Sequence, residues 1–260
     1  TATPERTLIL GWNTRAPRVL LMLEAYSPPG STVVIVARSG LVHQLDHAVG
    51  DSDRHEWRTI FARAQSGESN DAERRDGNPP KLHVEHQSAE ITRRSVLDEL
   101  GVPQFGQIIV LSSDATGDPQ LADARTLITL LHIRDIVDRA GVDVPIVSEM
   151  LDERNRDLAA VTRADDFIVS DRLIGLLLAQ LAENPEVDAV VANLFDPQGN
   201  EIYIKPVGDY VLLGEPVSFN TVLTSAFRRG ETAIGYRIGA TVGQGMPRNG
   251  IVLNPDRDKR

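Results

Sequence analysis

Short runs of β-branched and other apolar residues alternate with longer amphipathic segments from Thr7 to Val169 of this 260-residue sequence. The clearest run, Thr32–Ala37, reads Thr-Val-Val-Ile-Val-Ala, and its lack of polar alternation is typical of a strand buried on both faces. The segment before it, Ala16–Tyr26, repeats its apolar residues with helical spacing. Strands and helices that alternate in this way predict an α/β fold built on a doubly wound parallel sheet.

The other elements expected in this part of the chain follow the same order. Strands are expected at 7–10, 82–86, 107–111, 144–148 and 167–169, and helices at 40–65, 91–100, 119–140 and 152–162. Residues 67–80 contain almost no apolar side chain, so we expect a long loop there.

Beyond Ser170 the pattern changes. The segment Leu173–Leu181 is apolar on nearly every side of a helix, which indicates burial under another domain or in a subunit interface. It is followed by expected helices at 187–194 and 219–228 and expected strands at 201–206 and 232–237. These elements predict a small C-terminal α+β lobe.

Charge and composition exclude several classes of protein. The formal net charge of -10 is a poor match to a nucleic-acid or anionic-membrane binder. Cysteine is absent, which excludes a disulfide scaffold, a thiolate metal site and a cysteine nucleophile. The longest apolar stretch, Leu173–Ala179, is far shorter than the ~20 residues that span a bilayer. Because the sequence opens on Thr1 rather than Met, we expect a piece of a longer protein.

The first strand runs into a partial dinucleotide-binding fingerprint, Gly-Trp-Asn-Thr-Arg-Ala at residues 11–16. The first and third positions of G-x-G-x-x-G/A match, but Asn13 replaces the middle glycine and would crowd the pyrophosphate. The usual ribose-binding acid after the second strand is also missing, and Arg38-Ser39 stands there instead. We therefore expect no tight NAD binding. The alternative is a nucleotide-binding oxidoreductase or sensor in which Arg38-Ser39 takes a phosphate. Ligand candidates here are Gly11, Asn13, Arg15 and Arg38.

Polar side chains also follow the fourth and fifth strands. Open α/β sheets bind ligands at the carboxyl ends of their strands, where Ser112, Asp114 and Glu149 stand. Oxygen ligands favour calcium or magnesium, so Asp114 and Glu149 are the metal candidates. Asp118 and Asp152 lie at expected helix starts and are better explained as helix caps.

Other chemistry is weakly indicated. His43 and His47 would share one helix face, but no third ligand accompanies them, so a solvated polar face is the better interpretation. The sequence contains no G-x-S-x-G elbow and no Gly-Lys-Ser/Thr phosphate loop, which predicts a non-catalytic protein.

Several short motifs together resemble the CASTOR/POLLUX family of ion channels and its bacterial relatives. They are Gly11-Trp12-Asn13 with Arg15-Ala16-Pro17, Pro29-Gly30-Ser31, Asp166-Phe167-Ile168-Val169-Ser170, Glu201-Ile202-Tyr203 and Gly235-Tyr236-Arg237. The resemblance extends from about Thr7 to Pro255. Family members carry transmembrane helices followed by two cytosolic modules similar to regulator-of-potassium-conductance (RCK) domains, and this chain resembles the second module.

The resemblance implies a Rossmann-like lobe at 1–170, a crossover helix at 171–185 and a small α+β lobe at 186–260. It implies a gating-ring function at the cytoplasmic face of a membrane, with a cation, often calcium, as ligand. The implied partners are the first RCK-like module, the pore of the same protein and further copies of the chain; no nucleic acid is implied. The contact between copies would be the crossover helix, through Leu173, Ile174, Leu177, Leu178 and Leu181.

Overall fold

The computed structural model of the chain describes residues 3–38, 82–113, 117–155, 166–196, 202–238 and 250–258. They form two compact units, Thr1–Val191 and Ala192–Arg260. The expected helix at 40–65, the loop at 67–80, and His43, His47 and Asp114 all lie outside the described residues. The three-part organisation expected from the sequence stays a prediction.

The first unit is built on a six-stranded sheet whose strands follow the order β3-β2-β1-β4-β5-β6. Every neighbouring pair is parallel. The strands are β1 (Arg6–Leu10), β2 (Ser31–Ala37), β3 (Leu82–Ser88), β4 (Gln107–Val110), β5 (Ile146–Met150) and β6 (Asp166–Val169). The chain proceeds outward from β1 in one direction and then from β4 in the other, so a crevice is expected between the carboxyl ends of β1 and β4.

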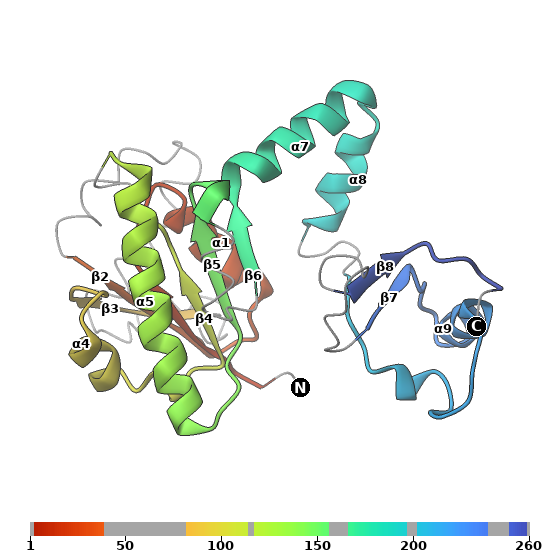
Figure 1. Cartoon of the computed structure of the whole chain (residues 1–260), viewed down its shortest axis with the longest axis horizontal. Coiled ribbons are helices and arrows are strands. Elements are labelled where there is room, and N and C mark those ends of the chain that lie inside the picture. Colours follow the sequence, from red (N-terminus) through yellow and green to blue (C-terminus); the bar gives the residue numbers. More distant parts are fainter. Residues whose placement is uncertain are drawn as a thin grey trace, which may run out of the picture. The chain divides into compact units, whose positions relative to one another are not determined.

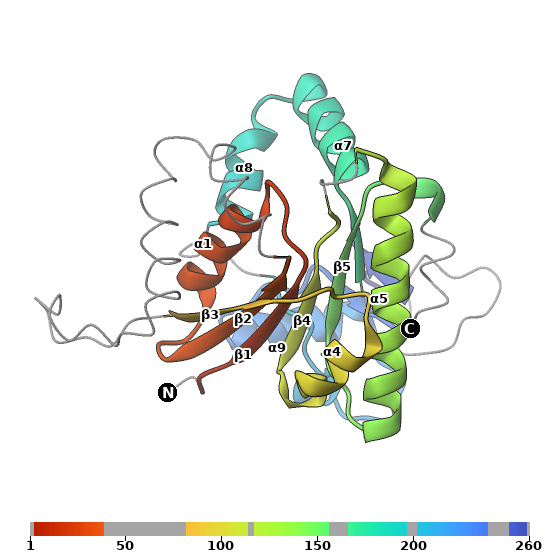
Figure 2. The same ribbon diagram turned by 90° about the vertical axis from the view of Figure 1, so that its left-hand side faces the viewer.

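Helices cover both faces of this sheet, as Figures 1 and 2 show. On one face, α1 (Ala16–Tyr26) packs with Ile9, Val33 and Ile35. On the other, α4 (Arg94–Glu99) and α5 (Pro119–Ala140) pack in a cluster that contains Leu8, Leu10, Val34 and Val36. Neighbouring strand residues enter opposite cores because strand side chains alternate between faces. The predicted doubly wound α/β fold is confirmed.

Two element boundaries differ from the expectation for identifiable reasons. The fifth strand was expected at 144–148 but runs from Ile146 to Met150. Pro145 has no N–H to donate, and only its carbonyl takes part, accepting a bond from Ile108 N. The helix expected at 91–100 begins at Arg94, because Arg93 is still extended. Of the helix expected at 152–162, the described residues show a 3-10 turn at Glu153–Asn155.

Two further helices follow the sheet: α7 (Ser170–Glu183) and α8 (Val187–Leu194). The second unit contains α9 (Phe219–Arg228) and an antiparallel pair, β7 (Gly235–Arg237) with β8 (Ile251–Leu253). The strand expected at 201–206 is wrong over its described part, Ile202–Pro206, which pairs with no described strand and ends in a proline. The sequence interpretation also missed β8.

Candidate functional site

The loop between β1 and α1 lies at the carboxyl edge of the sheet and begins with Gly11. Its φ of +91° lies in a region that side chains with a Cβ rarely adopt, and a Cβ there would lie 2.5 Å from the Leu111 carbonyl oxygen. The Gly11 amide donates to the Val36 carbonyl oxygen at 2.9 Å. This glycine therefore keeps the tight turn that the first position of the fingerprint requires.

Asn13 is fully buried and uses both ends of its amide. Its Oδ1 accepts hydrogen bonds from the backbone N–H of Arg15 (2.9 Å) and Ala16 (3.2 Å), at the start of α1. Its Nδ2 donates to the Ser112 carbonyl oxygen (2.8 Å) and to Glu149 Oε2 (2.6 Å). In a dinucleotide-binding protein, free N–H groups at this helix terminus receive the pyrophosphate. Here the Asn13 side chain binds these N–H groups instead.

Glu149 joins three separate segments at the edge of the sheet. Besides Asn13, it accepts a hydrogen bond from the Ser112 backbone N–H at 3.3 Å and pairs with Arg15 Nη1 at 3.0 Å. Its side chain is only 8% exposed, whereas that of Arg15 is 41% exposed. This carboxylate, near the end of β5, is thus held by the β1–α1 loop and by the residues that follow β4. Among the described residues, the Ser112 hydroxyl is buried without a hydrogen-bond partner.

The structure therefore brings together four ligand candidates from the sequence, Asn13, Arg15, Ser112 and Glu149, directly after the turn at Gly11. Asp114, the other metal candidate, lies outside the described residues. Within the described ranges, no three His, Cys, Asp or Glu side chains form a group that could hold a metal ion. Both oxygens of Glu149 already have nitrogen partners, so a cation at this carboxylate would have to displace Arg15.

Arg38 belongs to a different group of side chains. It is 67% exposed, and its Nε lies 3.9 Å from Glu90 Oε2. Arg125 Nη2 donates to both Glu90 carboxylate oxygens at 2.7 Å. Burial alone would raise the pKa of Glu90, but the hydrogen bonds and charge of Arg125, together with Thr92, outweigh it and leave that pKa below the ordinary value. The sequence analysis did not identify Glu90 or Arg125.

A second missed residue, Asp123, supports the loop that follows Glu149. This carboxylate is fully buried and accepts hydrogen bonds from the Leu151 N–H (2.9 Å), the Asp152 N–H (2.9 Å) and Asn155 Nδ2 (2.8 Å). A signal for it was present, because an aspartate stands on the core-facing side of the amphipathic helix α5.

The predicted caps are confirmed: Asp118 accepts from the Gln120 N–H and Asp152 from the Arg154 N–H, each at 2.9 Å.

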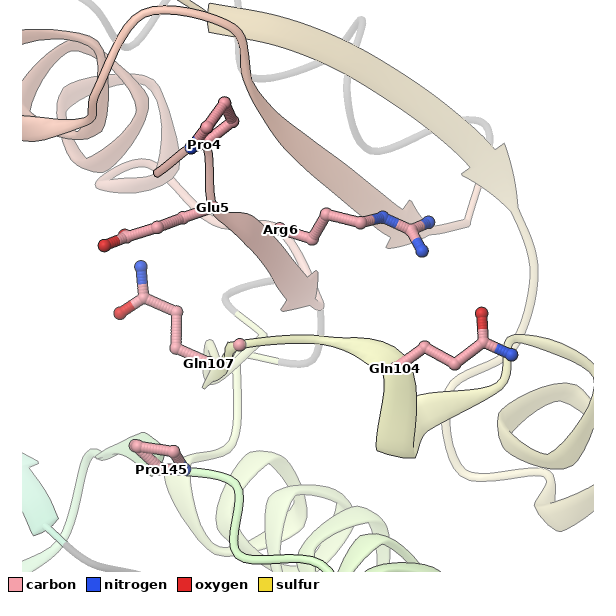
Figure 3. Close-up of a pocket in the computed structure, with 7 residues that line it drawn as sticks. Pro4, Glu5, Arg6, Gln104, Gln107 and Pro145 are labelled. Atoms are coloured by element: carbon pink, nitrogen blue, oxygen red, sulfur yellow. The ribbon is translucent and has the colours of Figure 1, made fainter. Parts of the chain in front are cut away.

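The amino edge of the same sheet carries a hollow of about 480 Å³, shown in Figure 3. It is lined by Pro4, Glu5, Arg6, Gln104, Gly106, Gln107 and Pro145. Gln107 donates to Thr7 Oγ1 at 2.8 Å, and the Arg6 guanidinium lies 4.9 Å from the centre of the Phe105 ring. The hollow contains none of the predicted site residues and lies opposite the edge where open α/β sheets bind ligands.

The candidate interface helix, α7, exposes its apolar side chains. Leu173 is 45% exposed, Ile174 52% and Leu178 63%, while Leu177 and Leu181 are half-buried. None of the described helices combines the length and the apolar character needed to cross a membrane.

No protein-family model matches the chain. It is 27% identical over 270 residues to the probable ion channel CASTOR of Oryza sativa subsp. japonica, covering 91% of this chain and 27% of that protein. It is 27% identical over 264 residues to the ion channel POLLUX of Lotus japonicus, covering 90% of this chain and 26% of the relative. The chain thus spans about a quarter of the length of these relatives.

Among solved structures, the human SLO3 gating ring matches with a TM-score of 0.56 at 13% identity, covering 98% of this chain and 42% of that one. The GsuK channel bound to NAD matches with a TM-score of 0.38 at 16% identity, covering 66% of this chain and 23% of that one, which is too weak to support a conclusion about a ligand here. The SLO3 match supports the fold alone. The resemblance found in the sequence is confirmed: over about nine-tenths of its length the chain is similar to the CASTOR and POLLUX ion channels.

Proposed function

We propose that this chain is a non-catalytic regulatory segment of an ion channel, acting in a gating ring on the cytosolic side of the membrane. The observation that carries the proposal is the similarity to ion channels over about nine-tenths of the chain. The fold it shares with a gating ring supports the same function. On the family resemblance, the segment corresponds to the second RCK-like module, and its partners are the first module and the pore of the same protein.

Assembly through α7 is the part of this proposal that the side chains support most directly. Leu173, Leu177 and Leu181 recur every four residues on one side of the helix, and Ile174 and Leu178 flank them. Exposed apolar surface of this kind marks an interaction site. A second copy of the same helix would cover it, because a two-fold axis lets one patch complement itself.

A ring needs a second surface, because a two-fold contact closes after two copies. The outward side of α5 offers one, with Leu121 50%, Ile128 45% and Leu131 51% exposed. These residues follow one another at intervals of seven and three positions, which places them along one stripe of the helix. We propose that this stripe forms the contact that joins dimers into the larger assembly.

The regulatory ligand is proposed to be a cation, with calcium as the first candidate and Asp114 and Glu149 as its ligands. For Glu149 to serve, Arg15 would have to release the carboxylate. Calcium titration by calorimetry of the native chain, Asp114→Ala and Glu149→Ala tests this, and equal affinity in all three would place any calcium site elsewhere.

Light scattering of the native chain at tens of micromolar tests the assembly. Leu178→Asp leaves the α5 contact intact and Ile128→Asp leaves the α7 contact intact, so each variant is expected to give folded species no larger than dimers. Met22→Asp changes a comparably exposed residue on α1, 42% exposed, and is expected to assemble like the native chain. A native chain that is monomeric would refute the α7 contact.

The channel function itself is tested by replacing the matching segment of Lotus japonicus POLLUX with this chain and comparing its currents with those of a Leu178→Asp chimera. Equal gating in both would contradict a regulatory role for α7.

A further inference from the structure

The crevice at the carboxyl edge of the sheet is filled by the chain's own polar groups. In a dinucleotide-binding protein, the N–H groups at the start of the first helix receive the anionic pyrophosphate. Here Asn13 Oδ1 accepts from the Arg15 and Ala16 N–H groups, at 2.9 and 3.2 Å. On the other side of the same amide, Nδ2 donates to Glu149 Oε2 at 2.6 Å. Asn13 therefore connects the N–H groups of the helix terminus to a carboxylate through consecutive hydrogen bonds.

The environment of Glu149 is one that a bound anion would have. Its carboxylate accepts from an amide, pairs with a guanidinium at 3.0 Å and accepts from the Ser112 backbone N–H at 3.3 Å. Glu149 is 7% exposed, so these donors, rather than water, compensate most of its charge. The hydroxyl of Ser112, the residue whose backbone N–H binds this carboxylate, is buried and has no hydrogen-bond partner among the described residues.

We propose that Asn13 and Glu149 together take the place of a ligand's phosphate, so that the chain carries its own anion in the crevice. Glu149 supplies the negative charge, and Asn13 connects that charge to the N-terminus of α1. The crevice is therefore closed to dinucleotides and is an anion site filled from within. This inference concerns the single chain without calcium, in which Arg15 keeps its contact with Glu149, and it does not depend on the proposed channel assembly.

Removing the internal anion should leave a site for an external one. In Glu149→Ala, the donors from Asn13, Arg15 and Ser112 remain while the carboxylate is lost. Formate, a carboxylate small enough for the vacated space, is expected to stabilise this variant. At a formate concentration about five times its Kd, the melting temperature should rise by about 2–4 °C above that in chloride of equal ionic strength. The native chain should show no formate-specific rise.

Two matched variants separate charge from packing. Glu149→Gln keeps the size of the side chain but removes its charge. It should therefore melt at a lower temperature than the native chain, and formate should not stabilise it because the glutamine still fills the space. Glu85→Ala removes an exposed carboxylate from β3 of the same sheet and should behave like the native chain. If Glu149→Ala is unfolded in chloride, its refolding yield becomes the measurement, and a yield that rises only in formate supports the proposal. Lack of any formate effect on Glu149→Ala, or a Glu149→Gln variant as stable as the native chain, would overturn it.

The role of Asn13 has its own test. Asn13→Gly combined with Glu149→Ala restores the middle glycine of the fingerprint and frees the N–H groups of α1. Inorganic pyrophosphate should stabilise this double variant more than it stabilises Glu149→Ala alone. An equal response in the two variants would show that Asn13 does not occupy the phosphate position.

Discussion

Replacing Gly11 by Ala should destabilise the chain through two separate effects at the start of the crevice. The first is backbone strain, because a φ of +91° costs a residue with a Cβ about 1–2 kcal/mol. The second is a collision, because the new Cβ would lie 2.5 Å from the Leu111 carbonyl oxygen. Forcing extra atoms into packed surroundings costs about 1–3 kcal/mol. Together they predict a loss of about 2–5 kcal/mol in the free energy of unfolding, or about 4–20 °C in melting temperature.

Two other glycines provide matched controls for this prediction. Gly141 also has a positive φ, +66°, but a Cβ there would meet no atom within 4 Å, so Gly141→Ala should cost only the strain of about 1–2 kcal/mol. Gly175 lies within α7 with open space around it, and Gly175→Ala should stabilise the chain by about 0.5–1 kcal/mol.

Urea denaturation followed by circular dichroism measures all three variants on the same scale. The expected order of stability is Gly175→Ala, native, Gly141→Ala and then Gly11→Ala. If Gly11→Ala loses no more stability than Gly141→Ala, the expected collision of the new Cβ with the Leu111 carbonyl oxygen is refuted.

Three other variants or conditions test the crevice, the loop after Glu149 and the separate Glu90–Arg125 pair. Asp123→Ala should lose about 2–4 kcal/mol in urea denaturation, because the Leu151 and Asp152 N–H groups lose their acceptor; a loss below about 1 kcal/mol would contradict the proposed support of this loop. Glu90 has a pKa below its ordinary value of 4.5, so the stability from its pair with Arg125 is complete above that value and is lost as the pH falls through the lower folded pKa. The urea midpoints of the native chain and Glu90→Gln should therefore converge below about pH 4.5, and a constant difference down to about pH 3 would argue against this. Calorimetry with NAD should show no micromolar affinity, because Asn13 blocks the helix terminus, and micromolar binding would refute that explanation.

The internal anion changes how the departure from the glycine fingerprint is interpreted. In the sequence, Asn13 appears only as a residue too large for a bound pyrophosphate. In the structure it binds the N-terminus of α1 on one side and Glu149 on the other. Its position is thus explained by contacts within the chain.

Much of the fold could be predicted because the signals for it are local. The bounds of α1, α5, α8 and α9 agree with the expected helices, since the apolar spacing and the flanking prolines and glycines lie within or beside each helix. The weaker predictions concern short strands. The expected strand at 201–206 was wrong over its described part and β8 was missed, because a strand of a few residues depends on its partner for its hydrogen bonds.

The sequence by itself therefore determined the layers of the first unit and the edge at which its polar side chains gather. Only the tertiary structure decided which of these side chains meet. Asn13 and Glu149 stand 136 positions apart, and they touch because the strand order places β1, β4 and β5 side by side. The order of parallel strands depends on long crossover connections and on the packing of helices over both faces, which no local pattern encodes. For the same reason, a buried carboxylate such as Asp123 becomes intelligible only when the loop that it binds is in place.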